Sequence, residues 1–338
     1  CNFPYAINYW TSAPALLEGN TIVMKPSEDT PMVGQIIADL YNEVGLPPGV
    51  FNLIHGDGEV GDYLVNNNVD HICFTGSAAV GKIIRQACAK SIHTTCSCEM
   101  GSKSAVMVFE DADMDLALSA TIASAFKLSG QRCVSSGRIL IHRSRYDEFC
   151  SRFVELASKI KVGDPFTEPD SMYGPLINRA QLERVMQFNE ATKKNAKVLL
   201  EGKRLERKGY FLTPHVYQSE WNNSVFLKEE VFGPHVALVP FNDLEDAIRI
   251  YNDTQYGLAL GCITNDYRVM REVRDRCEAG MMYFNLGSIG AESHFPFTGV
   301  KASGYGGGSA AATFDNVVHT VAVTTNHGKT LNFPQGLK

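Results

Sequence analysis

Short apolar runs alternate with helix-length segments along the first third of this chain, and this alternation limits the possible folds more than any other feature. The longer segments repeat apolar residues at helical spacing, as at Val33, Ile37 and Leu40. The pattern predicts strands at residues 20–24, 50–54, 71–74 and 105–109, and helices at residues 31–44, 61–66, 80–90 and 114–128. Because strands joined through helices form right-handed crossovers, we expect parallel sheets with ligands at the carboxyl ends of the strands.

The composition is that of a globular protein with room for two cores, since the chain has 338 residues of which 44% are hydrophobic and 20% charged. The net charge of −6 argues against a surface that binds nucleic acid. No run of about 18 apolar residues is present, so we expect no helix that spans a membrane. The nine cysteines lack the paired spacing of a metal site, which predicts no metal and reduced thiols.

Cys133 and Glu99 are the residues in which reactive chemistry is expected. Cys133 follows Gly130-Gln131-Arg132, and Glu99 lies 34 positions upstream of it among small and apolar residues. A thiolate can attack a carbonyl carbon, and a carboxylate can activate the water that releases the resulting thioester. Alone, each residue has a plainer interpretation: the cysteine as a small buried hydrophobe, the carboxylate as a surface group.

Seven motifs in order resemble those of the aldehyde dehydrogenase superfamily, over a region from Asn2 to about Thr325. Two of them are Glu99 and Cys133, which fall on the family's general base and nucleophile. The others are Asn2-Phe3-Pro4, Met24-Lys25-Pro26-Ser27-Glu28-Asp29-Thr30-Pro31, Phe74-Thr75-Gly76-Ser77 with Gly81, Glu229-Glu230-Val231-Phe232-Gly233-Pro234, and Asn285.

This resemblance implies an α/β fold with two parallel-sheet domains and an oligomerisation strand. Residues 1–101 would be part of a Rossmann-like NAD(P)-binding domain, residues 102–305 a catalytic domain, and residues 306–338 a tail carrying the oligomerisation strand. The implied activity is oxidation of a small-molecule aldehyde to a carboxylic acid with NAD(P). Its intermediates would be a thiohemiacetal and a thioester on Cys133, with Glu99 as the base that activates water.

The resemblance also assigns supporting residues. Asn2 would hold the substrate oxyanion together with the Cys133 backbone N–H, and Lys103 would tune or relay protons near Glu99. The residues expected to bind the cofactor are Lys25, Ser27 and Glu28 at the adenosine ribose, Phe74, Gly76 and Ser77 at the pyrophosphate, and Gly101, Glu230 and Phe232 on the nicotinamide side.

NAD is the expected cofactor, with NADP as the alternative. A carboxylate at Glu28 accepts a hydrogen bond from a ribose 2′-hydroxyl and repels a 2′-phosphate, although Lys25 can offset that repulsion. A second glycine motif, Gly56-Asp57-Gly58-Glu59-Val60-Gly61, matches the dinucleotide fingerprint after a strand. We interpret its glycines as structural turn residues, because the family resemblance places the pyrophosphate nearer Ser77.

The segment from Val317 to Thr324 alternates apolar and polar residues like an exposed strand. An unpaired edge of this kind favours pairing with another subunit, so we expect a homodimer or homotetramer. The reduced thiols predict the cytoplasm or the mitochondrial matrix. Neither a nucleic acid nor a membrane partner is expected.

The chain also departs from the family pattern. Gly101-Ser102 stands for the usual Gly-Gly, Leu128-Ser129-Gly130-Gln131 precedes the cysteine, Thr298 replaces a usual Gly, and Gly306-Gly307-Gly308-Ser309 replaces an expected Arg-Glu. The resemblance also implies that this sequence lacks the family's N-terminal portion. The chain would then be a fragment or a truncated homologue. These departures leave an alternative function open, a structural or assembly subunit with little or no turnover.

Overall fold

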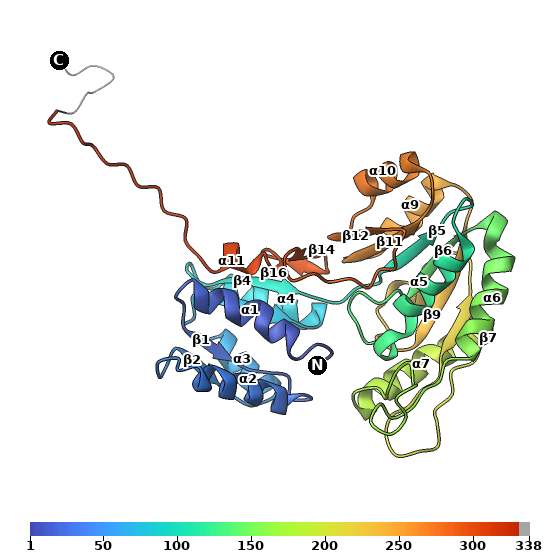
Figure 1. Ribbon diagram of the computed structural model, residues 1–338, viewed down its shortest axis with the longest axis horizontal. Coiled ribbons are helices and arrows are strands. Elements are labelled where there is room, and N and C mark those ends of the chain that lie inside the picture. Colours follow the sequence, from blue (N-terminus) through green and yellow to red (C-terminus); the bar gives the residue numbers. More distant parts are fainter. Residues whose placement is uncertain (331–338) are drawn as a thin grey trace.

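The computed structural model describes residues 1–330 and contains two α/β bodies side by side, with an extended C-terminal segment that leads away from the first (Figure 1). Its first elements alternate as expected: α1 (Ala6–Leu17), β1 (Ile22–Met24), α2 (Pro31–Glu43), β2 (Phe51–Leu53), α3 (Gly58–Val65), β3 (His71–Thr75), α4 (Ala78–Cys88) and β4 (Thr95–Glu99). Every strand and helix predicted between residues 20 and 128 occurs, with ends shifted by a few residues. The helix α1 and the strand β4 were not predicted.

The first four strands contribute to two small sheets of the first body. Strands β1 and β2 pair in parallel, and β3 pairs in parallel with β4. The helix α4 covers one face of the second pair, where Ile84 and Cys88 pack against Cys96 and Cys98. Its start is set by Ser77, whose hydroxyl accepts from the Val80 N–H at 3.3 Å, as an N-cap should.

The second body is built on a seven-stranded sheet in the order β12-β11-β5-β6-β9-β8-β7, parallel except for the edge strand β7. Its strands are β5 (Ala105–Val108), β6 (Arg138–His142), β7 (Lys197–Leu200), β8 (His215–Gln218), β9 (His235–Phe241), β11 (Ala259–Ile263) and β12 (Met281–Phe284). Its helices are α5 (Met114–Phe126), η1 (Lys127–Gly130), η2 (Arg143–Arg145), α6 (Tyr146–Ser158), α7 (Arg179–Asn195), α8 (Val225–Lys228), α9 (Leu244–Asn252) and α10 (Tyr267–Arg276).

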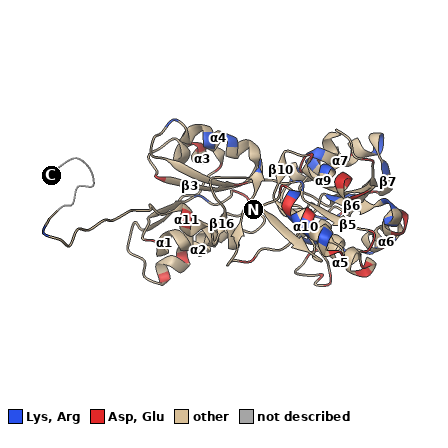
Figure 2. Cartoon of the chain, turned by 90° about the horizontal axis from the view of Figure 1, so that it is seen from above, with Lys and Arg blue, Asp and Glu red and all other residues tan. Residues whose placement is uncertain are grey.

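Helices cover both faces of this sheet, so its central strands are apolar at nearly every position. In β5, Val106 and Val108 face the core formed with α5 and α6, whereas Ala105 and Met107 face the core formed with α9 and α10. Charged residues of both signs are spread over the outer helices (Figure 2), where they pair, as in the Arg276–Glu245 ion pair. Within residues 1–330, no helix is long and apolar enough to cross a bilayer.

After β12 the chain returns to the first body. The returning elements are β13 (Pro296–Phe297), β14 (Val300–Lys301), β15 (Gly304–Tyr305), β16 (Ser309–Ala310) and α11 (Thr313–Asn316), and β14 pairs with β10 (Tyr256–Gly257). Strand β15 pairs antiparallel with β4, and α11 packs on α1. The expected catalytic domain ended at residue 305, whereas here residues 304–305 already belong to a sheet of the first body.

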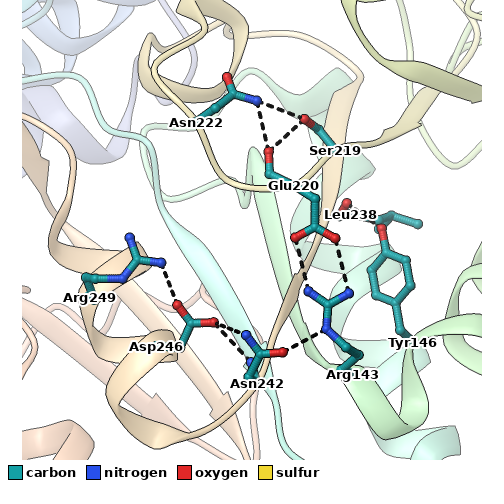
Figure 3. Close-up of polar contacts among 9 residues, drawn as sticks. All are labelled: Arg143, Tyr146, Ser219, Glu220, Asn222, Leu238, Asn242, Asp246 and Arg249. Atoms are coloured by element: carbon teal, nitrogen blue, oxygen red, sulfur yellow. Dashed lines mark hydrogen bonds and ion pairs between the residues drawn. The ribbon is translucent and has the colours of Figure 1, made fainter.

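A polar network holds together the loops at the carboxyl edge of the large sheet (Figure 3). Arg143, which follows β6, donates two hydrogen bonds of 3.1 Å to Glu220, which follows β8. Its Nε donates to Asn242, which follows β9, at 2.8 Å. The Tyr146 hydroxyl donates to the Leu238 carbonyl at 2.8 Å. These contacts connect the loops that follow β6, β8 and β9, so they stabilise the fold at this edge of the sheet.

The segment expected to be an oligomerisation strand has no strand partner within residues 1–330. It runs extended beyond α11, and its valines are exposed, with Val321 at 74% and Val323 at 81%. Its start is held by the Asn20 amide, which donates to the Val317 carbonyl at 3.1 Å. A strand needs a partner to complete its hydrogen bonds, so the oligomerisation strand stays a prediction about an assembly of several chains. Residues 331–338 of the expected tail lie outside the described part.

Candidate active site

A buried segment, residues 100–104, joins β4 of the first body to β5 of the second and passes through the centre of the candidate site. Both ends are anchored by distant residues. The Met100 N–H donates to the Ser303 carbonyl at 2.8 Å, and the Ser303 hydroxyl donates to the Gly101 carbonyl at 2.8 Å. At the other end, the Lys103 carbonyl accepts from the Arg138 guanidinium at 2.7 and 3.0 Å. We call residues 100–104 the crossing segment.

Glu99 lies at the end of β4, immediately before the crossing segment. Its backbone is fixed, because its carbonyl accepts from the Gly76 N–H at 3.0 Å and its position pairs with Gly304. The side chain is only 4% exposed, and neither carboxylate oxygen has a hydrogen-bond partner within residues 1–330. Burial raises the pKa of Glu99 to about 9, so the group holds its proton at neutral pH.

The loop that carries Cys133 begins with an unusual backbone. Leu128, Ser129 and Gly130 have positive φ angles of 58°, 58° and 67°, so the chain turns sharply after α5. A side chain at Gly130 would collide with the Gly233 carbonyl, which explains the glycine. Gln131 fastens the turn, since its side-chain oxygen accepts from the Ile177 N–H at 2.9 Å.

Cys133 is half-buried beside the crossing segment, and the Ser102 hydroxyl donates to its carbonyl. Burial raises the pKa of the Cys133 thiol to about 12, with further contributions from Glu230 and Glu99. The backbone N–H groups of Val134 and of Cys133 itself act in the opposite direction. The cysteine packs with an apolar cluster that includes Trp10, Tyr283, Ile289 and Phe297.

Glu230 lies on the other side of the crossing segment. Its Oε1 accepts from the Ser102 N–H at 2.9 Å, and a side chain at Gly101 would collide with its Oε2. Burial raises the pKa of Glu230 to about 7. A cavity of about 20 Å³ lies here, large enough for one water molecule, and Lys103 and Phe232 are among its lining residues.

Lys103, which we expected to tune or relay protons near Glu99, donates from its Nζ to the Phe226 carbonyl at 2.9 Å, within the second body. Burial, helped by the Arg138 charge, lowers the pKa of Lys103 to about 7. Its charge acts on Glu230, which lines the same cavity.

The residues expected at the adenosine end lie in the first body. Lys25 donates to the Gly56 carbonyl at 2.9 Å and pairs with Glu28 at 3.6 Å, while the Ser27 hydroxyl accepts from the Asp29 N–H at 3.3 Å. Gly56 and its neighbours form a turn in which Asp57 caps α3, accepting from the Glu59 N–H at 3.0 Å. The Asp57 carboxylate occupies the start of α3. This supports the interpretation of Gly56, Gly58 and Gly61 as structural turn residues.

The predicted residues therefore fall into groups. Glu99, Gly101, Cys133 and Glu230 come together around the crossing segment. The Phe74 ring lies against Gly76 at the end of β3, next to Ser77. Asn2 adjoins Phe3, whose ring lies 5.2 Å from the Arg132 guanidinium, so the start of the chain reaches the nucleophile loop. Within residues 1–330, no hydrogen bond or ion pair joins Lys25, Ser27 or Glu28 to Glu230.

Three functionally placed residues were missed from the sequence. Ser102, Ser303 and Arg138 hold the crossing segment through contacts with residues distant in the chain. Of these three residues, only Ser102 stood out in the sequence, because it replaces the second glycine of the family's Gly-Gly. Ser303 lies in none of the seven motifs, and the sequence pattern predicts a surface charge for an arginine such as Arg138.

The position of the site relative to the sheets also differs from expectation. Glu99 and Gly76 follow the carboxyl ends of β4 and β3, as predicted for a parallel sheet. In the large sheet the site instead lies at the amino edge, because the crossing segment precedes β5, Cys133 precedes β6 and Glu230 precedes β9. The network of Figure 3 holds the loops at the opposite edge.

Known proteins resemble this chain over almost its whole length. The model of the Aldehyde dehydrogenase family matches residues 1–323. An aldehyde dehydrogenase from Aspergillus niger is 37% identical over 333 residues, covering 98% of this chain and 67% of that protein. The mitochondrial succinate-semialdehyde dehydrogenase of Arabidopsis thaliana is 41% identical over 308 residues, covering 90% of this chain and 58% of that protein.

Solved structures agree with these matches. The aldehyde dehydrogenase of Mycobacterium tuberculosis complexed with NAD+ superposes with a TM-score of 0.92 at 33% identity, covering 98% of this chain and 68% of that one. The 1-pyrroline-5-carboxylate dehydrogenase from Thermus with bound NAD gives a TM-score of 0.89 at 32% identity, covering 93% of this chain and 62% of that one. The chain thus spans roughly two thirds of the length of these relatives. It belongs to the aldehyde dehydrogenase family.

Proposed function

We propose that this chain carries the reacting groups of an NAD-dependent aldehyde dehydrogenase that converts an aldehyde to a carboxylic acid. The observation that carries the proposal is the crossing segment. It starts next to Glu99, bonds the Cys133 carbonyl through the Ser102 hydroxyl, and bonds Glu230 through the Ser102 N–H. The crossing segment thus connects three groups from separate elements: the proposed nucleophile, the proposed base and a second carboxylate.

The chemistry follows from the two reacting side chains. The Cys133 thiolate adds to the aldehyde carbon, and the developing oxyanion is held by neutral donors, the Cys133 backbone N–H and the Asn2 amide. Loss of hydride from the thiohemiacetal leaves a thioester on Cys133. Glu99 then takes a proton from a water molecule that attacks the thioester, which releases the acid and restores the thiol.

The protonation states of these groups set the pH at which the reaction proceeds. With a pKa of about 9, Glu99 must lose its proton before it acts as a base. Burial likewise raises the pKa of the Cys133 thiol, to about 12, so its thiolate forms more readily as the pH rises. Both groups therefore favour turnover on the alkaline side of neutrality.

NAD fits the residues present and supplies, when bound, the nicotinamide ring that accepts a hydride. Glu28 and Glu230 are carboxylates suited to ribose hydroxyls, and the start of α4 at Ser77 is suited to a phosphate because helix N-termini attract anions. The bound NAD in the Mycobacterium and Thermus structures supports this choice. We propose NAD over NADP because Glu28 would repel a 2′-phosphate.

The experiment that tests the function is aldehyde-dependent NADH production by the purified protein, with propanal and succinate semialdehyde as substrates. Cys133→Ala should abolish production while NAD binding persists, because the thiol forms the covalent intermediate and makes no essential cofactor contact. Cys73→Ala, which removes a thiol on β3 outside the site, is the control and should retain activity. Wild-type protein that binds NAD but oxidises no aldehyde would favour the assembly-subunit alternative.

A further inference from the structure

Ser102 makes contacts that no step of the proposed reaction uses. The residue is 3% exposed, within the crossing segment, at the position where the chain departs from the family's Gly-Gly. Its hydroxyl contacts the Cys133 carbonyl, the Ser104 hydroxyl at 2.7 Å and the Ser104 N–H at 3.1 Å. A glycine at this position would make none of these contacts.

The direction of the Ser102 hydroxyl follows from counting donors and acceptors. A hydroxyl has one hydrogen to donate and two lone pairs that accept. The Cys133 carbonyl only accepts, so the Ser102 hydrogen is donated to it. The Ser104 N–H only donates, and the Ser104 hydroxyl fills the remaining lone pair. Every bonding position of the Ser102 hydroxyl is used, so its orientation is fixed.

Holding the Cys133 carbonyl also orients the next N–H group. The peptide that joins Cys133 to Val134 is planar and trans, so its C=O and N–H point in opposite directions. Backbone hydrogen bonding from the Val134 N–H is one of the two contributions that lower the pKa of the Cys133 thiol. The carbonyl of this peptide is therefore bonded to Ser102, and its N–H stabilises the thiolate of Cys133.

We propose that Ser102 is a positioning residue for the nucleophile, holding the Cys133 carbonyl so that the Val134 N–H stays directed at the Cys133 sulfur. The role rests on the proposed use of Cys133 as the nucleophile. It deepens that function with a residue specific to this chain, since the sequence pattern of the family has glycine at this position.

Other charged and titratable groups also face the Cys133 sulfur. Glu230 and Glu99 oppose its ionisation, and Arg132, the amino terminus of Cys1 and Tyr283 each interact with it electrostatically. Changes to the Ser102 side chain leave these groups in place. They also keep the bond from the Ser102 backbone N–H to Glu230, so the effect of the hydroxyl can be measured separately.

The test is the rate at which iodoacetamide alkylates Cys133 in the full chain, measured by peptide mass spectrometry across a series of pH values without aldehyde or cofactor. The variants are Ser102→Ala, Ser102→Gly and the conservative Ser102→Thr. Ser97→Ala is the matched control, because it removes a buried hydroxyl from β4 whose contacts are with His71 and Cys73, and not with Ser102 or Cys133. Circular dichroism establishes that each variant is folded.

We expect Ser102→Ala and Ser102→Gly to slow alkylation at neutral pH about three- to tenfold and to move its midpoint to higher pH, the effect of one misdirected hydrogen bond to a charged group. Ser102→Thr should restore the wild-type profile, and Ser97→Ala should stay within about twofold of it. Unchanged alkylation in a folded Ser102→Ala or Ser102→Gly protein would overturn the proposal, as would an equal effect of Ser97→Ala.

The readout is independent of turnover. If wild-type protein oxidises no aldehyde but the alkylation profile responds as expected, the proposed function fails and the positioning role of Ser102 stands. In an active protein, Ser102→Ala should also slow the first turnover of NADH formation, because the thiol attacks in that step.

Discussion

At the scale of single residues, burial of charge is the main influence on the candidate site. Glu99 has a pKa of about 9, against a usual value of 4.5, because the protein surrounds it without supplying a partner. Between pH 4.5 and 9 the unfolded chain would therefore carry an ionised carboxylate while the folded chain keeps a proton. The contribution of Glu99 to the free energy of unfolding is therefore greatest at low pH. It falls as the pH rises through this window, by up to about 1.4 kcal/mol per pH unit.

Replacing Glu99 with glutamine tests this balance, because the amide of Glu99→Gln does not ionise. The melting temperature of the variant should match that of wild type near pH 5 and exceed it increasingly toward pH 9. Thermal unfolding at several pH values measures the difference, in which the contributions of Lys103 and Glu230 cancel. A difference that does not change with pH would show that Glu99 is not protonated in the folded protein.

The same variant separates the two halves of the reaction. Without the base, thioester hydrolysis should slow more than hydride loss, so one fast turnover of NADH should precede a much slower steady state. Mass spectrometry of the stalled protein should find an acyl group on Cys133. Unaltered steady-state turnover, with neither burst nor adduct, would assign Glu99 a structural role.

The sequence singled out Cys133, Glu99 and Glu230 as candidates, because these residues lie in motifs whose chemistry is recognisable one residue at a time, and the structure brings them to one crossing segment. The sequence was not sufficient for Ser102 or Ser303. A serine can cap a helix, close a turn or face solvent, and its role depends on partners 31 and 202 positions away, Cys133 and Gly101. The partner of Lys103, the Phe226 carbonyl, could not be predicted for a related reason, since a flexible side chain can reach several carbonyls.

At the scale of elements, the turn between α5 and β6 decides where the nucleophile lies. Gly130 combines a φ of 67° with close approach to the Gly233 carbonyl. Gly130→Ala should therefore cost about 1–3 kcal/mol of stability and displace Cys133, lowering activity at least about tenfold. Gly58→Ala is the control, because a side chain there would meet no atom within 4 Å. Urea unfolding and steady-state rates measure both effects, and equal activity in the two variants would contradict the role of the turn.

The alternation of strands and helices predicted the elements themselves but not the edge of the sheet that holds the site. Period and composition identify a strand, whereas the order of strands in a sheet depends on contacts between distant segments. Strand β15, only two residues long, pairs with β4 although 205 positions separate Gly304 from Glu99. Such short strands carry no periodic signal. Their pairing is nevertheless what brings Ser303 to the crossing segment.

At the scale of the whole molecule, the C-terminal segment remains without a partner within residues 1–330. Beyond α11 the chain runs extended, and Val318, Val321 and Val323 are exposed in a stretch that suits a β-strand. Alternation of side chains predicts a strand only where a neighbouring strand is available to complete the hydrogen bonds. We expect that neighbour to be a second copy of the chain, in an assembly with closed symmetry.

Truncation tests this expectation, and the structure indicates where to cut. Removal of residues 318–338 keeps α11 and the bond from Asn20 to Val317, so the first body should remain folded. Light scattering at matched micromolar concentration should then give a smaller mass than for the full chain. Removal of residues 325–338 alone is the control, because it keeps the alternating segment. This shorter truncation should leave the number of chains per assembly unchanged. A full-length chain that is monomeric at micromolar concentration would refute the assignment, since the exposed valines would then have no partner of this kind.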